Sequence, residues 1–260
     1  MARRRRRPLI ALFIVFVVLP AALVISMRLM RTGYKPPVAV RGQIFRLRNF
    51  FTEIYGARAG GKVVLFDAGI DTEGHALDAL LAELHATRDD VSDVFLTHGH
   101  FDHVAASPLC SKARIHVGAP DVDLLAKRDP NVPFAGRWFG RILPVGPITA
   151  TDPYVGRVEL PVDGGKVIAI PLPGHTSGSY VLYYDRVLFA GDSMQIEGGK
   201  LDFCMPSFSL DPAANKKHIA NLKAQLGDLP VDVVCTGHQG CITVDGQKLL
   251  DELIARATAG

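Results

Sequence analysis

The sequence is poor in cysteine and lacks the cysteine spacing of small metal-stabilised domains. Its four cysteines are Cys110, Cys204, Cys235 and Cys241, and no two of them have Cys-x-x-Cys spacing. A structural zinc finger is therefore not supported. An exported domain could pair some of these thiols. However, a loop containing His238 separates Cys235 from Cys241, and the sequence favours no disulfide.

The sequence also lacks an excess of basic residues outside one run, Arg3 to Arg7. Without this run the chain has 24 basic and 26 acidic residues, so the formal charge of +3 falls to −2. The body of the protein therefore has nothing like the basic face of a nucleic-acid-binding protein, and we expect no nucleic-acid partner. With 260 residues, of which 48% are apolar, the chain is long enough for one large domain or two small ones.

The one long apolar run lies near the N-terminus. Residues Leu9 to Met27 contain no charge and as a helix would extend about 28 Å, close to the thickness of a bilayer core. The arginine run precedes this segment, and only Arg28 and Arg31 follow it, so the N-terminus is expected in the cytoplasm. Residues 1–31 are thus predicted to be a transmembrane anchor, with the body in the periplasm or outside the cell. A cleaved signal peptide is the alternative, with a site at Val24-Ile25-Ser26 and a secreted product.

Beyond this segment, residues 32–41 read as a linker and residues 42–260 as the folded domain. The domain alternates strand-like and helix-like segments. Strands are expected over 50–57, 62–67, 91–97, 114–117, 166–171, 179–184, 186–189 and 231–235. Helices are expected over 72–86, 102–111, 120–127, 212–226 and 246–257. Residues 131–153 are interpreted as a loop or flap.

Four potential metal ligands fall within six residues of Thr97-His98-Gly99-His100-Phe101-Asp102-His103. His98 and His100 alternate in an extended segment, so both can reach one metal. Asp102 and His103 begin the next helix and can turn towards a second. Three more candidates, His175, Asp192 and His238, follow strand ends in glycine-flanked loops, where an α/β scaffold gathers a site. Together these seven residues predict a two-metal hydrolytic centre, whereas the isolated His75, His85, His116 and His218 are expected to be non-ligands.

From about residue 42 to its end, the chain resembles the metallo-β-lactamase superfamily and looks nearest to its glyoxalase II-like branch. The resemblance implies an α/β fold with four layers, an αβ/βα sandwich of two mixed sheets with helices outside. It also implies two zinc ions, with iron or manganese as other possible metals. The family pattern assigns His98, His100 and His175 to one metal, and Asp102, His103 and His238 to the other. Asp192 bridges the two, Asp67 supports the ligands, and Asp102 and His238 are the candidate catalytic residues.

The activity implied is that of a dinuclear zinc hydrolase that cleaves an ester, thioester or lactone bond in a small molecule through a metal-bound hydroxide. Asp192 stands where the better-known zinc β-lactamases have cysteine or serine, which disfavours hydrolysis of a β-lactam amide. Gln195 replaces a tyrosine common in the acyl-homoserine lactonases. The added C-terminal region of glyoxalase II and the inserted domain of nuclease members are not seen.

Two further interpretations stay open. A persulfide dioxygenase-like oxidoreductase would use one iron with the first His-x-His, the later histidine and the aspartate, but the full second set ending in His238 argues against it. A binding module without activity would be expected to lack ligands. For the substrate groove we expect residues 131–153 and 197–210, where the apolar residues could instead be ordinary core or face a membrane. These residues are Phe134, Trp138, Phe203, Met205 and Phe208.

Overall fold

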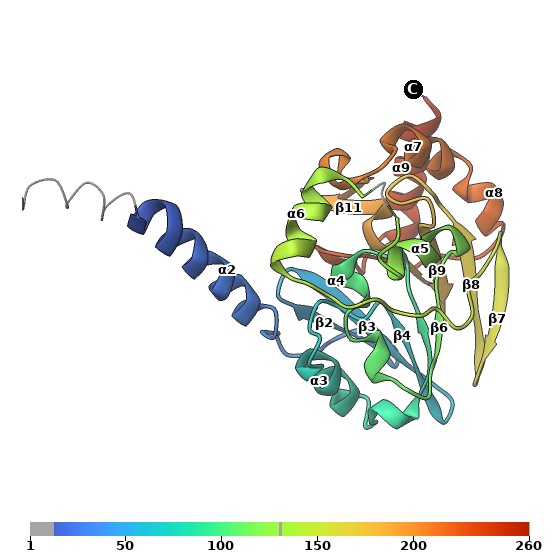
Figure 1. Cartoon of the computed structure of the whole chain (residues 1–260). Helices are drawn as coiled ribbons and strands as arrows, with labels where there is room; N and C mark the ends of the chain where they lie inside the picture. The colour runs from blue at the N-terminus through green and yellow to red at the C-terminus, as the bar shows by residue number, and fades with distance from the viewer. Residues whose placement is uncertain (1–12, 130–131, 260) are drawn as a thin grey trace, which may run out of the picture.

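The structure is a computed structural model that describes residues 13–129 and 132–259. The first part of the predicted apolar segment, residues 9–12, therefore lies outside the described residues. A π-helical turn, η1 (Ile14–Val18), runs into helix α2 (Leu19–Met30), none of whose side chains is buried. In Figure 1 this helix projects from the body beside α6 and β2. A search of the described residues finds no helix with the length and apolar content needed to cross a bilayer.

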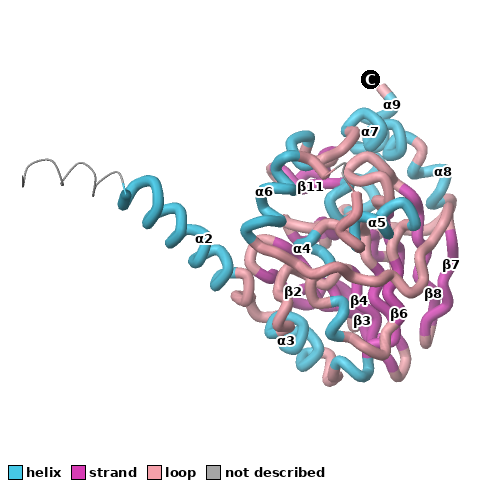
Figure 2. Tube along the Cα trace, viewed as in Figure 1, coloured by secondary structure: helices cyan, strands magenta, loops and turns pink. Residues whose placement is uncertain are grey.

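Two six-stranded sheets form the centre of the described body, as Figures 1 and 2 show. The first sheet contains, in spatial order, β1 (Val38–Arg41), β2 (Ile44–Asn49), β3 (Thr52–Ala59), β4 (Lys62–Phe66), β5 (Val91–Phe95) and β6 (Arg114–His116). The second contains β14 (Gly240–Ile242), β13 (Val233–Thr236), β10 (Val187–Phe189), β9 (Tyr180–Tyr184), β8 (Gly165–Pro171) and β7 (Val158–Val162). Both sheets are mixed, because β4, β5 and β6 pair in parallel in the first and β10 pairs in parallel with β13 in the second.

Alternation along the strands assigns side chains to three apolar cores. In β4, Val64 and Phe66 lie in the core between the sheets, whereas Val63 and Leu65 lie in the core beneath the outer helix of the first sheet. The ring of Phe66 stacks on Phe189 of the second sheet at a centroid distance of 3.9 Å. Because such aromatic pairs are fully buried, they hold the two sheets face to face.

Helices cover the outer faces of both sheets. Leucines of α3 pack on the first sheet, and residues of α7, α8 and α9 pack on the second. The helices that follow α2 in the chain are α3 (His75–Glu83), α4 (Phe101–Val104), α5 (Val122–Leu125), α6 (Phe134–Ile142), α7 (Pro212–Ala220), α8 (Leu222–Leu226) and α9 (Gly246–Thr258). The predicted four-layer αβ/βα sandwich is therefore confirmed.

The structure differs from the expected elements in where some helices and strands begin and end, and in two helices that are interrupted. The segment predicted as a loop over 131–153 contains helix α6, and the structured chain enters the predicted linker because residues 38–41 form β1. The helix expected over 102–111 is split, since Pro108 starts a separate 3₁₀ turn (Ser107–Leu109). The helix expected over 212–226 breaks into α7 and α8 at Asn221. Strands β2, β7 and β14 were not foreseen, and neither was a separate two-stranded sheet of β11 (Met194–Glu197) and β12 (Lys200–Phe203).

Candidate metal centre

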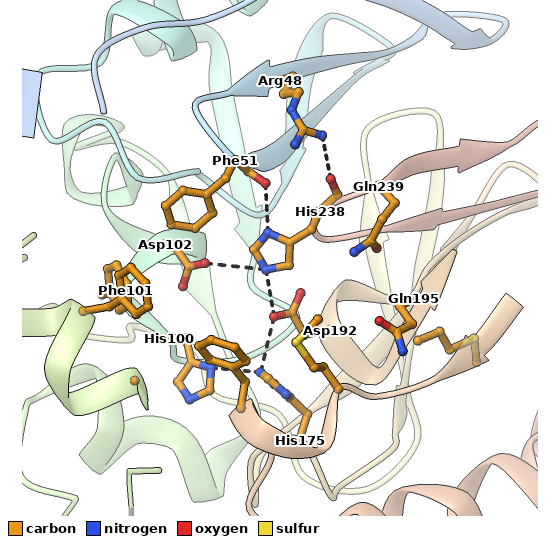
Figure 3. Close-up of a pocket in the computed structure, with 15 residues that line it drawn as sticks. Arg48, Phe51, His100, Phe101, Asp102, His175, Asp192, Gln195, His238 and Gln239 are labelled. Carbon is orange, nitrogen blue, oxygen red and sulfur yellow. Dashed lines mark hydrogen bonds and ion pairs between the residues drawn. The ribbon is translucent and has the colours of Figure 1, made fainter. Parts of the chain in front are cut away.

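The seven predicted ligands converge at the ends of strands from both sheets, as Figure 3 shows for five of them. The His98–His103 segment follows β5, and His175 follows β8. Asp192 lies in a 3₁₀ turn, η5 (Gly191–Ser193), directly after β10, and His238 lies in the turn between β13 and β14. Strand ends gather side chains that are far apart in the sequence, because neighbouring strands end at the same edge of a sheet.

Three buried histidines direct ring nitrogens at one point. The Nε2 atom of His175 lies 2.9 Å from Nδ1 of His100 and 3.2 Å from Nε2 of His98, and the last two atoms are 3.1 Å apart. Nitrogens on a tetrahedral zinc ion, with bonds of about 2.0–2.1 Å, stand about 3.3 Å from one another. This group therefore has the spacing of three ligands around one small cation.

A second group consists of Asp102, His103 and His238. Nε2 of His238 lies 3.6 Å from an oxygen of Asp102, and Nε2 of His103 lies 3.7 Å from the same atom. Asp192 stands between the two groups, since Oδ2 is 3.0 Å from Nε2 of His238 and 3.5 Å from Nε2 of His175. Its position is that of a carboxylate able to contact two cations at once.

Two buried atoms in this cluster have no hydrogen-bond partner within the described residues. They are Nε2 of His103 and Oδ1 of Asp192, which lie 3.4 Å apart. A buried polar atom without a partner costs roughly 1–3 kcal/mol, so such an atom needs an explanation. Both atoms point into the centre, and both belong to residue types that bind zinc. The donor set therefore fits a metal ion there.

The electrostatics divide the five histidines into two classes. Burial lowers the pKa of His98, His100 and His175, so these rings are neutral at pH 7. Burial also opposes charge on His103 and His238, but the carboxylates of Asp192 and Asp102 outweigh it. They raise the pKa of His103 well above its ordinary value and that of His238 to about 9. In turn, His238 and His103 outweigh burial at Asp192 and hold the pKa of its carboxyl well below the usual range.

Further hydrogen bonds fix the orientation of the rings. Asp67 accepts from Nδ1 of His103 at 2.9 Å and from the backbone N–H of Thr97 at 2.8 Å. Nδ1 of His238 donates to the carbonyl of Phe51 at 3.0 Å. With Nδ1 engaged in this way, Nε2 is left free to face the centre. The supporting position predicted for Asp67 agrees with these contacts.

Asp121 supports the first histidine group and was missed from the sequence. This fully buried carboxylate accepts from the backbone N–H of Gly99 at 2.8 Å, from the N–H of Gly178 at 2.7 Å and from the hydroxyl of Thr176 at 2.7 Å. It thus joins the His98–His100 loop to the loop that contains His175. Its chain neighbours carry no ligand motif, so only the packing of three loops reveals this contact.

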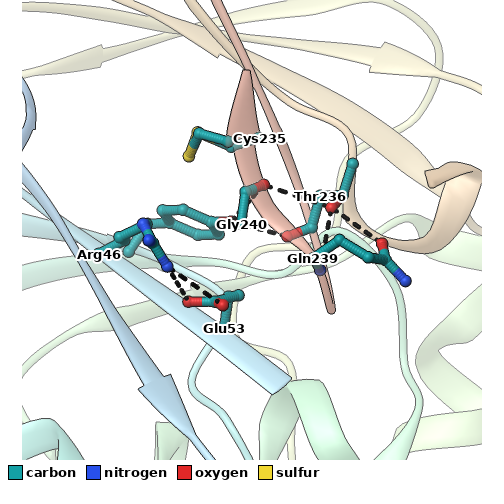
Figure 4. Close-up of a disulfide and its surroundings, with 8 residues drawn as sticks. Arg46, Glu53, Cys235, Thr236, Gln239 and Gly240 are labelled. Carbon is teal, nitrogen blue, oxygen red and sulfur yellow. Dashed lines mark hydrogen bonds and ion pairs between the residues drawn. A yellow bond between two sulfur atoms is a disulfide. The ribbon is translucent and has the colours of Figure 1, made fainter. Parts of the chain in front are cut away.

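A disulfide joins Cys235 to Cys241 across the β13–β14 hairpin, at a Cα–Cα distance of 4.0 Å. This contradicts the expectation that no pairing is favoured. The intervening loop separates the cysteines in sequence, but it also turns the chain back so that they become opposite residues of an antiparallel pair. The bond closes the turn that contains His238 at its base, and Figure 4 shows Cys235 beside Thr236 and Gly240 at this point. The hydroxyl of Tyr55 donates to the carbonyl of Thr236, the last residue of β13.

A cavity of about 410 Å³ opens onto the cluster. Asp102, Asp192 and His238 reach it from the metal centre, and Arg48 lies at its edge, where it donates to the carbonyl of His238 (Figure 3). Its walls are mainly apolar. The residues that form them include Phe51, Phe101, Phe139, Met194, Met205 and Phe208.

The predicted groove residues are placed only in part as expected. Met205 and Phe208 line the cavity, and α6 contributes Gly136 and Phe139 from the predicted flap. Trp138 is 46% exposed, and neither it nor Phe203 is among the lining residues. Nothing is described of the side chain of Phe134. Among the described residues, the metal-holding groups do not include the histidines set aside from the sequence, namely His75, His85, His116 and His218.

Comparison with known proteins agrees with this architecture. By sequence, the chain is 26% identical over 197 residues to a hydroxyacylglutathione hydrolase of Fuscovulum blasticum, covering 74% of this chain and 63% of the relative. The chain thus spans less than two thirds of that relative's length. It is also 25% identical over 211 residues to the uncharacterized protein YobT of Bacillus subtilis, covering 73% of this chain and 83% of that protein.

Many solved structures are similar to this chain, and two of them illustrate the likeness. A metallo-beta-lactamase family protein of Thermus thermophilus has a TM-score of 0.60 at 24% identity, covering 87% of this chain and 80% of that one. A metallo-beta-lactamase of Cronobacter sakazakii has a TM-score of 0.67 at 17% identity, covering 90% and 95%. At these identities the likeness shows the fold alone.

The sequence profile of the metallo-beta-lactamase superfamily matches residues 50–238, which is well over half of the chain. The match begins before the supporting Asp67 and ends at the last predicted ligand, His238, so it contains all seven converging side chains. The fold, the order of these side chains along the chain and the profile agree, and the chain belongs to the metallo-beta-lactamase superfamily, whose members are largely metal-dependent hydrolases.

Proposed function

We propose that this protein is a dinuclear zinc hydrolase that cleaves an ester, thioester or lactone bond in a small molecule. The observation that carries the proposal is the pair of orphaned atoms, Nε2 of His103 and Oδ1 of Asp192, at the junction of two three-residue groups with ligand spacing. A distant likeness to a hydroxyacylglutathione hydrolase supports the thioester class.

In this proposal His98, His100 and His175 hold one zinc ion, and Asp102, His103 and His238 hold the second, with Asp192 between them. Bound zinc would lower the pKa of a water molecule to near neutrality and polarise a substrate carbonyl. The chain itself supplies position and proton acceptance. Asp102 reaches the cavity, where its carboxylate can accept a proton from the attacking water and return it to the leaving group.

His238 has a second part in the proposal because it borders the cavity as well as the metal group. The Phe51 carbonyl and Arg48 hold this residue from two sides, through its ring and its backbone oxygen. A ring held in this way loses little freedom when substrate enters, which keeps the reacting groups aligned. The apolar walls supplied by Phe139, Met205 and Phe208 favour a substrate with an apolar portion.

The test is metal analysis of the purified full-length chain, followed by assays on thioesters, lactones, esters and β-lactams. We expect about two zinc ions per chain, with hydrolysis of the first three classes. Asp192→Asn should abolish turnover while leaving the far-ultraviolet circular dichroism unchanged. Asp251→Asn, which changes a partly exposed carboxylate paired with Lys223, serves as the matched control.

Three results would contradict the proposal. Full turnover by an Asp192→Asn protein of known metal content would show that this residue does not bridge two metal ions. One iron per chain with persulfide-dependent oxygen uptake would replace the hydrolase by an oxidoreductase. Cleavage of β-lactams alone would replace the ester class by an amide hydrolase.

A further inference from the structure

The surface around the base of α2 combines positive charge with apolar and aromatic side chains. Arg28 near the end of α2 and Arg137, Trp138 and Arg141 on α6 are exposed, and Arg31 is half-buried. We call these five residues the basic-aromatic surface. Large apolar side chains are exposed along both η1 and α2, among them Phe16 in η1 and Leu23 and Leu29 in α2.

Hydrogen bonds connect the two helices that form this surface. Nε of Arg28 donates to the carbonyl of Ile142 at 2.9 Å, and Arg31 donates to the carbonyl of Pro144 at 3.4 Å. Two arginines of the N-terminal segment are thus used to hold the end of α6. Figure 1 shows α2 leaving the body next to α6.

Helix α6 has two different faces. Gly136 and Phe139, three residues apart, line the cavity above the metal centre. Arg137, Trp138 and Arg141 lie on the other side, where helical spacing brings residues three and four apart together. The same nine-residue helix therefore separates the substrate cavity from the basic-aromatic surface.

The charge of the chain is divided unevenly. The first 52 residues contain 11 basic residues and no acidic one, so all 26 acidic residues lie beyond them. Residues 130–151, which include α6, also lack Asp and Glu. The two segments that meet at the basic-aromatic surface thus bring no carboxylate to it, while the rest of the chain is acidic. This distribution favours an extended anionic partner.

We propose that the basic-aromatic surface docks on an anionic lipid bilayer, with α2 in contact with its apolar interior and Trp138 at the headgroups. Tryptophan and arginine beside an apolar helix are typical of the membrane interface. Nucleic acid would match the arginines but offers nothing to the apolar side chains of α2. Since α6 lines the cavity, docking sets the mouth of the active site beside the lipid surface, where amphiphilic substrates concentrate.

Trp138 is the single tryptophan of the chain, so its fluorescence reports on this surface directly. The full-length protein is mixed with vesicles of phosphatidylcholine alone or with one quarter phosphatidylglycerol. With the anionic vesicles we expect the protein to co-sediment, its emission to shift to the blue, and quenching by aqueous iodide to fall. Lipids brominated in their acyl chains should then quench the emission.

The charge contribution is tested with Arg137→Gln/Arg141→Gln. Each arginine near an anionic surface contributes an attraction equivalent to roughly five-fold in partitioning, so the pair should weaken binding by more than ten-fold. The matched control is Arg157→Gln/Lys166→Gln, which removes the same charge beside β7, on the far side of the body from α2 in Figure 1.

Several outcomes would overturn this docking surface. In one, the protein sediments with vesicles while Trp138 stays accessible to iodide, which would mean that α6 lies away from the lipid. If the two double variants weaken vesicle binding equally, the arginines of α6 have no specific part in docking. Binding to duplex DNA without binding to anionic vesicles would identify the other class of partner.

Discussion

His103 and His238 are held in the charged form by the carboxylates that they would share a metal with. The pKa of His238 is raised to about 9 and that of His103 well above its ordinary value, mainly because Asp192 and Asp102 outweigh burial. A metal must displace these protons before it can bind. The three histidines of the other group are already neutral at pH 7, because burial lowers their pKa.

We therefore expect the two metal sites to differ in pH dependence. Both His103 and His238 must lose a proton, so affinity at the second site should rise by up to about 100-fold per pH unit while both rings are charged, and the contribution of His238 should end above about pH 9. Affinity at the His98–His100–His175 group should change little above pH 7. Zinc titrations against a competing chelator between pH 6 and 9.5 measure both, and equal slopes at the two sites would contradict the assignment.

Asp121 offers a second prediction at the scale of one residue. Asp121→Asn replaces an acceptor of three hydrogen bonds by an amide whose N–H₂ group would face donors. Because the loops of the first histidine group would separate, we expect zinc affinity at that site to fall roughly 10–100-fold. The second site should lose far less. Asp123→Asn, on an exposed neighbour paired with Arg128, is the control, and equal losses at both sites would point to general unfolding.

Among the described residues, the β13–β14 hairpin is the one ligand loop that a disulfide closes, since the Cys235–Cys241 bond joins residues six apart on either side of His238. The sequence spacing alone gave no reason to pair these cysteines. What pairs them is the antiparallel register of two short strands, and strand β14 was itself not foreseen. Short strands have too few residues for alternation to be visible in the sequence.

Removal of this disulfide should affect the second metal site more than the first. Closure of so short a loop stabilises the folded state by roughly 2 kcal/mol through the unfolded chain, so Cys235→Ser/Cys241→Ser should lower the free energy of unfolding by about that amount. Loosening of the turn should also weaken zinc binding by His238. Chemical denaturation and metal stoichiometry distinguish the two effects, with the wild-type protein before and after reduction as the control, because Cys110 and Cys204 are buried and their replacement would itself disturb the packing. Unchanged stability and full zinc content would show that hydrogen bonds alone hold the turn.

Helix α6 is another element for which the structure differs from the prediction. Gly136, Gly140 and several isolated prolines nearby are typical of a loop. In the structure Leu143 at its end is fully buried and Phe139 contacts Phe208 at a ring distance of 6.3 Å. Tertiary packing thus outweighs weak helix propensity here.

We expect Phe139→Ala to act on substrate binding rather than on chemistry. The change removes one apolar wall of the cavity but touches none of the seven ligand residues, so KM for substrates with a long apolar group should rise several-fold at nearly constant kcat. Substrates with a two-carbon acyl group, which have little apolar surface to place against this wall, serve as the internal control. A fall in kcat for both substrate lengths, or lost zinc, would show that α6 instead supports the metal centre.

Across the whole molecule, the ligands are divided between the two halves. His98, His100, Asp102 and His103 follow a strand of the first sheet, whereas His175, Asp192 and His238 follow strands of the second. A metal that binds both sets also connects the sheets at that end. Binding to the folded state alone adds stability by mass action, about 2.7 kcal/mol at a free zinc concentration one hundred times the dissociation constant.

Chelation should therefore lower the thermal unfolding temperature of the wild-type protein by several degrees. Asp192→Asn should show a smaller shift, because its bridge between the two groups is lost. Differential scanning calorimetry with and without chelator measures both. If chelation leaves the wild-type transition unchanged in a protein that had bound zinc, the metals do not join the two halves.

The sequence by itself determined the seven ligand candidates, and their resemblance to the metallo-β-lactamase superfamily implied the four-layer sandwich. Ligand residue types at close spacing, and strands that end at glycine-flanked loops, are local patterns that can be recognised in the sequence. Only the tertiary structure decided which side chains meet. Three features depend on contacts between different elements. They are the hydrogen bonds of Asp121 to two loops, the Cys235–Cys241 bond across β13 and β14, and the position of α6, which lines the cavity and contacts α2. Such contacts arise from the packing of whole elements, which no local pattern encodes.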